Sequence, residues 1–95
     1  MGLIVQKFGG SSVATTEKLK LVAEHIKKEL DLKNQVVVVV SAQGKTTDRL
    51  IAEEKEIAKN PSPREHDVLV STGEQITIAK LSMALEQQGI KAISL

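Results

Sequence analysis

The sequence predicts an α/β fold with a mainly parallel sheet and helical crossovers between the strands. Two short apolar runs, residues 3–5 and 36–40, have the length and β-branched content of buried strands. Between them, apolar residues recur at helical spacing, which predicts an amphipathic helix. A helix that connects two strands of one sheet makes them parallel. The expected buried side of this helix consists of Leu19, Val22, Ala23, Ile26 and Leu30.

The two strands and the first helix carry further local signals. Residues 3–5 run into Lys7-Phe8-Gly9-Gly10, which predicts a strand that feeds a glycine turn. Val36 to Val40 are continuous valines without polar alternation, so we expect a central parallel strand covered on both faces. A hydroxyl of Thr15 or Thr16 can cap the helix, because it accepts a hydrogen bond from an unpaired N–H of the first turn.

The second half of the chain predicts further helices. A polar loop at residues 41–47 precedes a helix over 48–58, and Ser62-Pro63-Arg64-Glu65 is a well-formed start of another. We expect a buried side on each. The expected buried residues of the helix over 48–58 are Leu50, Ile51, Ile57 and Ala58. Those of the helix that starts at Ser62 are Val68, Leu69 and Val70.

Thr72-Gly73-Glu74-Gln75 repeats the capping pattern, which predicts a break or kink near Gly73 before a last helix that runs to about Gln88. Gly89 is expected to end that helix in a left-handed conformation, with Ile90 packing back. Residues 91–95 have the pattern of a third strand. A sheet that stops there leaves an edge or a face for something else to cover, so we expect a fragment.

Composition narrows the class of protein. The 95 residues fit one small domain, and 41% of them are apolar. With 13 basic and 12 acidic residues, the net charge of +1 provides no footprint for nucleic acid or an anionic membrane. Cysteine is absent, and the longest apolar run has 5 residues, far below the roughly 20 that span a bilayer. We therefore expect a cytoplasmic protein without nucleic-acid or membrane partners.

Two polar loops follow the predicted strands, and ligands of parallel sheets bind outside the carboxyl ends of strands. Gly9 and Gly10 lack Cβ atoms, so their amides can approach a phosphate, and the helix that follows directs its positive end there. Lys7 adds a positive charge, which phosphoryl transfer requires. From these residues alone, a plain tight turn with a solvated lysine explains the pattern equally well.

The second loop contains Gly44-Lys45-Thr46, which imitates the end of a nucleotide-binding P-loop. The full pattern requires a glycine five residues before Gly44, where this chain has Val39. We therefore reject a P-loop.

Five sequence segments together point to a family. They are Lys7-Phe8-Gly9-Gly10-Ser11-Ser12-Val13, the segments 37–42 and 46–51, Arg64-Glu65-His66-Asp67, and Ser71-Thr72-Gly73-Glu74-Gln75. In order and approximate spacing the chain resembles aspartate kinases of the amino acid kinase family over its whole length. The resemblance implies a partial three-layer α/β/α fold, with residues 1–95 as the N-terminal, amino-acid-binding portion of the kinase domain. The resemblance further implies that the nucleotide-binding half and the regulatory domains of such proteins lie outside these residues.

The resemblance also implies a reaction and its residues. The γ-phosphoryl group of ATP, with Mg²⁺ held through its phosphates, passes to the β-carboxylate of L-aspartate in lysine, threonine and methionine biosynthesis. Lys7 is the implied catalytic residue. The implied phosphate-binding residues are Lys7, Phe8, Gly9, Gly10, Ser11 and Ser41, and the implied substrate-binding residues are Thr47 and Glu74. The full-length protein is expected to be a homo- or hetero-oligomer, and these 95 residues alone are expected to be inactive.

Simpler explanations compete for the same residues. Glu74 has the pattern of a first-turn helix carboxylate, and Thr47 with Asp48 that of an ordinary helix cap. His25 and His66 have no clustered partners, which is typical of surface residues rather than metal ligands, so no metal site is predicted. Gln43 departs from the family, in which an apolar residue is common there. Two other functions stay open: a related kinase for another carboxylate or carbamate, and a non-catalytic anion-binding or assembly module.

Overall fold

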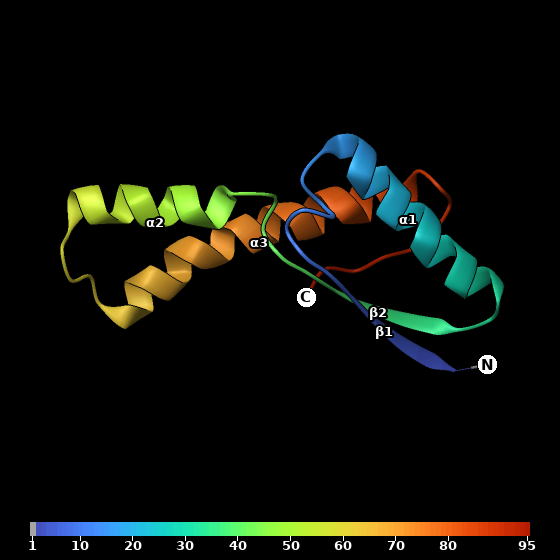
Figure 1. The fold of residues 1–95 in the computed structure, drawn as a ribbon. Coiled ribbons are helices and arrows are strands. Elements are labelled where there is room, and N and C mark those ends of the chain that lie inside the picture. The colour runs from blue at the N-terminus through green and yellow to red at the C-terminus, as the bar shows by residue number, and fades with distance from the viewer. Residues whose placement is uncertain (1) are drawn as a thin grey trace.

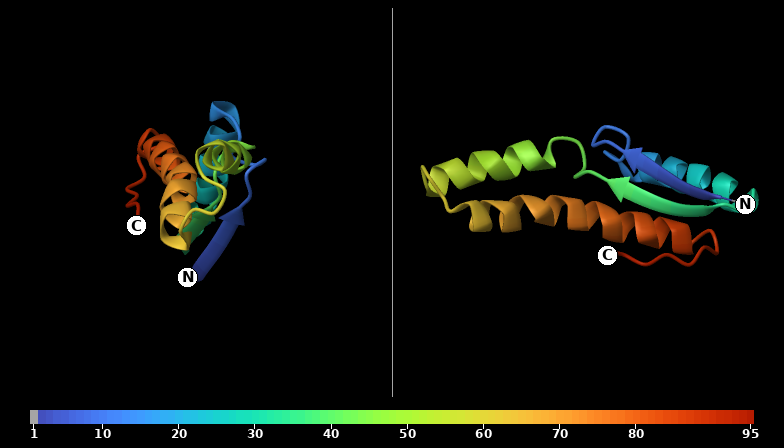
Figure 2. Two further views of the ribbon diagram at one scale, coloured as in Figure 1. Left: turned by 90° about the vertical axis from the view of Figure 1, so that its left-hand side faces the viewer. Right: turned by 90° about the horizontal axis from the view of Figure 1, so that it is seen from below.

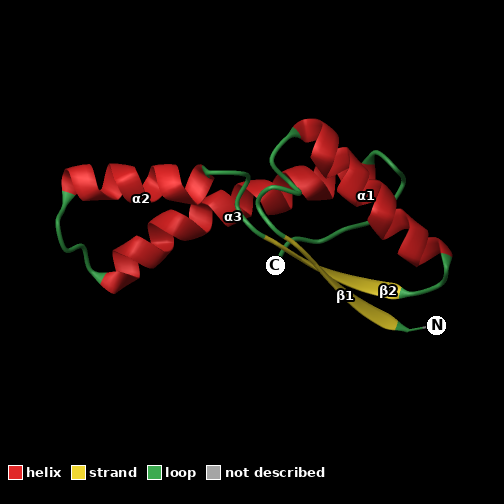
Figure 3. Ribbon diagram, viewed as in Figure 1, coloured by secondary structure: helices red, strands yellow, loops and turns green. Residues whose placement is uncertain are grey.

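The computed structural model describes residues 2–95, which form two strands and three helices. In chain order these are β1 (Leu3–Phe8), α1 (Thr16–Asp31), β2 (Gln35–Val40), α2 (Thr46–Ile57) and α3 (Pro63–Glu86) (Figures 1 and 3). β1 and β2 are parallel, and their register pairs Leu3 with Gln35 and Phe8 with Val40. The predicted α/β class, parallel sheet and crossover helix are confirmed.

The core lies between one face of the sheet and two helices. α1 buries Leu19, Val22, Ala23 and Ile26, as its periodicity predicts, and α3 adds Leu81 and Leu85. Phe8, Val36, Val38 and Val40 face this cluster from the sheet. Burying such aliphatic side chains stabilises a fold by about 1.5–3 kcal/mol each, so this cluster is the main source of stability.

The other sheet face is open, which differs from the prediction that β2 is covered on both faces. Leu3 and Val5 on β1 are 63% and 65% exposed, and Val37 and Val39 on β2 are 47% exposed. The strands alternate because both helices that pack on them, α1 and α3, contact the same face. Within the described residues the chain thus supplies a sheet layer and one helical layer.

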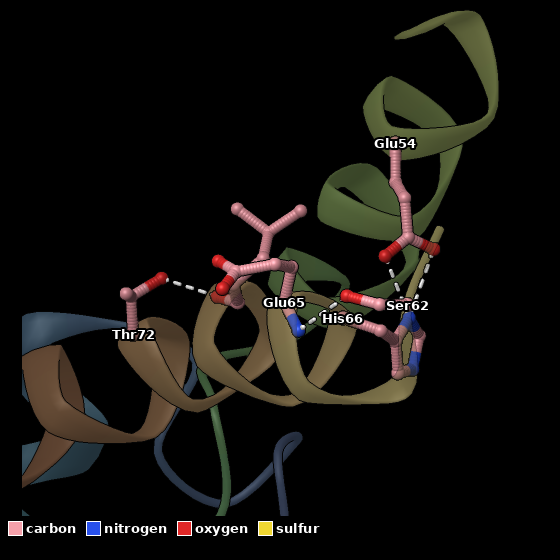
Figure 4. Close-up of polar contacts among 6 residues, drawn as sticks. Glu54, Ser62, Glu65, His66 and Thr72 are labelled. Atoms are coloured by element: carbon pink, nitrogen blue, oxygen red, sulfur yellow. Dashed lines mark hydrogen bonds and ion pairs between the residues drawn. The ribbon is translucent and has the colours of Figure 1, made fainter. Parts of the chain in front are cut away.

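α3 is one continuous helix, so the predicted break near Gly73 is wrong. Gly73 and Thr77 are buried in its interior, and the hydroxyl of Thr77 donates to the Gly73 carbonyl at 3.3 Å. The capping pattern at Thr72 fails because Thr72 instead donates its hydroxyl to the Leu69 carbonyl, 2.6 Å away, within the helix (Figure 4).

Helix ends follow the local signals more closely. Thr15 accepts from the Lys18 N–H at 3.2 Å and Ser62 from the Glu65 N–H at 3.4 Å, so both predicted caps are confirmed. After α3, Gly89 has φ of +76°, and the Ile90 N–H donates to the Leu85 carbonyl at 3.1 Å. This turn confirms the predicted left-handed ending, in which Ile90 packs against the core.

The predicted third strand at residues 91–95 is wrong, since this segment is not hydrogen-bonded into the described sheet. It runs back along α3 beside β2 (Figures 1 and 2). An apolar trough of about 510 Å³ separates it from the valines of β2. Ala92 packs against the core, so the apolar pattern correctly indicated partial burial but not strand pairing.

α2 and the first half of α3 form a hairpin that reaches away from the sheet (Figures 1 and 2). The Nδ1 atom of His66 lies 2.7 and 2.9 Å from the two carboxylate oxygens of Glu54, which ties the helices together (Figure 4). Few side chains bury there: Ile57 is 85% exposed and Val68 is 52% exposed, so both are wrongly predicted as buried. None of the described helices has the length and apolarity to cross a membrane.

Candidate functional site

The loop after β1 and the loop after β2 lie side by side at one end of the sheet. The Ser41 N–H donates to the Phe8 carbonyl at 3.1 Å, and the Gly44 N–H donates to the Gly10 carbonyl at 2.9 Å. Parallel pairing places both strand ends at the same edge, so the topology itself brings the loops together.

Gly10 allows this close approach. A Cβ atom at this position would lie 2.9 Å from the Ala42 carbonyl oxygen and 3.1 Å from that of Gly44. Gly9 differs, because a Cβ there would meet nothing within 4 Å. The second loop needs its glycine for another reason, since Gly44 has a left-handed φ of +50°.

The carbonyl groups of the first loop, which spans residues 9–15, are largely satisfied within the protein. Gly9 accepts from the Ser12 N–H at 3.1 Å, Ser11 from the Lys18 ammonium at 2.9 Å, and Val13 from the Gln43 side chain at 2.9 Å. The amides of Gly10 and Ser11, in contrast, donate to no other group among the described residues. Successive free N–H groups at a turn are suited to binding an anion.

The other predicted phosphate-binding residues border this loop in different ways. Lys7 lies on the exposed face of β1, paired in register with Val39. Ser41 is half-buried directly after β2. The Phe8 side chain packs against the core, so a contact between Phe8 and a phosphate can involve only its main chain.

The predicted substrate-binding residues lie where α2 and α3 meet the second loop. A Cβ on Gly73 would lie 2.9 Å from the Ala42 Cβ and 3.2 Å from the Thr46 Cγ2, so α3 contacts the loop and the first turn of α2 there. Thr47 directly follows Thr46 on α2, and Glu74 directly follows Gly73 on α3. The structure therefore brings these two segments to the loop that pairs with the glycines.

The simpler explanations of Thr47 and Glu74 do not apply. Glu74 lies in the middle of α3, so no preference of helix starts for carboxylates accounts for it. α2 begins after Lys45 and has no side-chain cap, so neither Thr47 nor Asp48 caps it. Both Thr47 and Glu74 are at least partly accessible to solvent.

Three polar residues near the loops were not predicted from the sequence. Lys18 and Gln43 bond the first loop, and Lys80 on α3 donates its ammonium to the Gln43 side-chain oxygen at 2.8 Å. Gln43 stood out only as a departure from the family, and no local pattern links it to residues 30 and 37 positions away. Among the described residues, no three His, Cys, Asp or Glu side chains cluster as metal ligands.

Comparison with known proteins decides the family, because the model of the amino acid kinase family matches residues 2–95. The chain belongs to the amino acid kinase family. An aspartokinase from Geobacillus stearothermophilus is 55% identical over 95 residues, and one from Pseudomonas aeruginosa is 56% identical over 94 residues. They match 100% and 99% of the chain, respectively. The resemblance to aspartate kinases is therefore confirmed over the whole chain.

The fold agrees with this membership. A crystal structure of aspartate kinase from Synechocystis superposes with a TM-score of 0.95 at 54% identity, and the match covers 98% of this amino acid kinase family chain. The chain spans 23% of the length of each of the two curated relatives and 16% of the crystallised chain.

Proposed function

We propose that this chain forms the amino-acid-binding portion of an aspartate kinase, which transfers the γ-phosphoryl group of ATP to the β-carboxylate of L-aspartate. The product is an acyl phosphate for lysine, threonine and methionine biosynthesis. One observation carries the proposal: free amides after β1 adjoin the β2 loop, and the same loop contacts the segments that hold Thr47 and Glu74. The similarity to aspartokinases supports the choice of substrate.

The phosphate side of the proposed site uses the first loop. The amides of Gly10 and Ser11 donate to phosphate oxygens, and the open surroundings of Gly9 let the phosphate approach the backbone. The ammonium of Lys7 and the hydroxyl of Ser41 complete the set, with Lys7 neutralising charge that develops on the transferred group. Phe8 anchors this loop through the core.

The amino-acid side uses α2 and α3. The Glu74 carboxylate pairs with the α-ammonium of aspartate, and the Thr47 hydroxyl donates to a substrate carboxylate. Holding the substrate from two helices that contact the β2 loop directs its β-carboxylate toward the phosphate. Orientation of this kind can supply a large part of the rate enhancement.

ATP supplies the phosphoryl group, and its Mg²⁺ is held through the phosphates rather than by a carboxylate cluster of this chain. The nucleotide-binding half and regulatory domains are expected outside residues 1–95. We expect the reaction to take place in the cytoplasm and the full-length protein to act as an oligomer.

Substitution of Glu74 tests the function. In the complete protein, with ATP, Mg²⁺ and L-aspartate, Glu74→Gln removes a charge-assisted bond worth about 1.5–3 kcal/mol. We expect the KM for aspartate to rise about 10- to 150-fold, because each 1.4 kcal/mol is a factor of about ten. Hydroxylamine traps the acyl phosphate as a hydroxamate, which measures turnover directly.

Glu53→Gln is the matched control, since Glu53 is exposed on α2 and forms no ion pair within the described part of the chain. Its KM for aspartate should stay that of wild type. Absence of aspartate-dependent hydroxamate from the complete wild-type protein would refute the function, and turnover with a different carboxylate would reassign it to a related kinase. The 95 residues alone should give no appreciable turnover.

A further inference from the structure

Gln43 connects three segments that are far apart in the sequence. Its Nε2 donates to the Val13 carbonyl at 2.9 Å in the first loop, and its Oε1 accepts from the Lys80 ammonium at 2.8 Å on α3. Gln43 itself lies in the loop after β2. One side chain thus ties together the two loops and the helix that carries Glu74.

The partners fix both the orientation of this amide and the residue type. A carbonyl only accepts and an ammonium only donates, so the amide nitrogen faces Val13 and the amide oxygen faces Lys80. Glutamate lacks the donor, methionine lacks the donor and has only a weak acceptor, and lysine lacks the acceptor. Glutamine combines a donor, an acceptor and the length needed.

The Gln43 contacts act on the first loop, residues 9–15, which binds phosphate in the proposed function. The β2 loop contacts the first loop twice, through the Gly44 N–H to the Gly10 carbonyl and through the Gln43 side chain to the Val13 carbonyl. These two contacts lie on either side of Ser11 and hold carbonyls toward the protein, which leaves the amides of Gly10 and Ser11 free.

Lys80 extends the tie to α3. Gly73, Thr77 and Lys80 lie at helical spacing, and Gly73 and Lys80 both contact the β2 loop, at Ala42 and Gln43 respectively. Glu74 therefore lies on the segment of α3 that is fixed to this loop. In the proposed function, these contacts set the position of the phosphate-binding amides of the first loop relative to the Glu74 carboxylate.

We propose that Gln43 is a positioning residue. Together with Lys80, it fixes the position of the first loop, residues 9–15, relative to helix α3, which carries Glu74. This inference rests on the proposed function for its kinetic consequence. Gln43 touches neither the phosphate nor aspartate, and it acts through the main chain of residues 9–15. Its loss should weaken the use of ATP more than the binding of aspartate.

The kinetic test compares Gln43→Met, Gln43→Glu and Lys80→Met in the complete protein. For Gln43→Met we expect kcat/KM for ATP to fall about three- to tenfold, the effect of one ordinary hydrogen bond, with the KM for aspartate within about twofold of wild type. Gln43→Glu keeps the Lys80 contact but should lose at least as much, because its carboxylate faces the Val13 carbonyl. Lys80→Met should lose less, since the bond to Val13 remains.

The double variant tests whether the two residues act together. Gln43→Met with Lys80→Met should be no worse than Gln43→Met alone, because both belong to one hydrogen-bond network. Gln87→Met and Lys27→Met are matched controls at exposed positions, and neither side chain has a hydrogen-bond partner among residues 2–95. The proposal would be overturned if the losses of kcat/KM for ATP in the two single variants multiplied in the double variant. It would also be overturned if the KM for aspartate rose as much as kcat/KM for ATP fell.

Hydrogen exchange supplies a readout independent of activity. In Gln43→Met the Gly44 N–H, which bonds the Gly10 carbonyl, should exchange about three- to tenfold faster, while core amides such as that of Val22 stay at the wild-type rate. An unchanged exchange rate of the Gly44 N–H would refute the role of Gln43 in holding the two loops together. If wild type makes no hydroxamate, the proposed function fails and this measurement alone decides whether Gln43 holds the loops.

Discussion

Gly9 and Gly10 are neighbours, but their surroundings give them different sensitivities to an added methyl group. In Gly10→Ala the Cβ meets the carbonyl oxygens of Ala42 and Gly44 at 2.9 and 3.1 Å, and backbone atoms cannot move away easily. We expect the free energy of unfolding to fall by about 1–3 kcal/mol, the usual cost of overpacking. Denaturant unfolding of the complete protein measures this.

Gly9→Ala serves as the control for the same chemical change. Nothing lies within 4 Å of its Cβ, so stability should stay within about 0.5 kcal/mol of wild type. The same methyl group lies on the open side where a phosphate would approach, and we expect weaker ATP binding. Equal stability losses in the two variants would contradict the close contact between the loops at Gly10.

Residues of the site differ in how far the sequence could predict them. The glycine loop, Ser41, Thr47 and Glu74 lie within motifs whose order along the chain indicates the family. The bonds from Gln43 to Val13 and Lys80 depend on tertiary placement, because neither partner lies within the same helix or loop. Short-range patterns contain no information on such pairs.

At the scale of elements, Gly73 illustrates how packing overrides local preference. Glycine in a helix interior costs about 1 kcal/mol relative to alanine, and together with Thr72 it gave a helix-start pattern. α3 nevertheless continues through this point, since Gly73 is buried against Ala42 and Thr46. The break was wrongly predicted because the sequence does not reveal which face of α3 meets the β2 loop.

Gly73→Ala should therefore destabilise the protein despite the better helix propensity of alanine. The added Cβ would lie 2.9 Å from the Ala42 Cβ, and we expect a net loss of about 1–3 kcal/mol in the free energy of unfolding. Ala42→Gly removes the opposing methyl group, so Gly73→Ala with Ala42→Gly should be more stable than the sum of the single changes predicts. Additive losses would show that the two residues do not touch.

The α2–α3 hairpin buries few apolar side chains, so we expect its polar contact to contribute to stability. His66 donates from Nδ1 to the Glu54 carboxylate, which is mostly buried (Figure 4). His66→Ala should lower the free energy of unfolding by about 0.5–1.5 kcal/mol, the ordinary contribution of a hydrogen bond.

His25→Ala is the control, since His25 is exposed on α1, and its effect should stay within about 0.5 kcal/mol. Thermal unfolding of both variants, followed by circular dichroism, measures the difference. A loss for His66→Ala no larger than that for His25→Ala would mean that the contact contributes nothing to the hairpin.

On the scale of the whole molecule, the apolar pattern predicted the α/β class and the helical side of the core, but not what covers the rest. Continuous valines at 36–40 are typical of a strand between two layers, and here only the face toward α1 and α3 is covered. Periodicity indicates how apolar a face is, and it does not identify the segment that packs there.

We expect the open sheet face to make the 95-residue chain prone to self-association. Val5 and Val37 are Cα partners in the parallel register and are 65% and 47% exposed on this face. Val5→Lys with Val37→Glu replaces them by an opposite-charge cross-strand pair, which is compatible with the sheet. We expect the wild-type chain to associate with rising concentration and the double variant to stay monomeric, as measured by sedimentation velocity.

A control with the same charges separates this face from general solubility. Leu32→Glu with Ile57→Lys changes exposed apolar residues that lie outside the sheet, 68% and 85% exposed. That variant should associate like wild type, because contact between exposed apolar sheet faces and strand edges drives the process. Monomeric wild type at all concentrations, or equal rescue by both variants, would contradict the assignment of association to the outer face of β1 and β2.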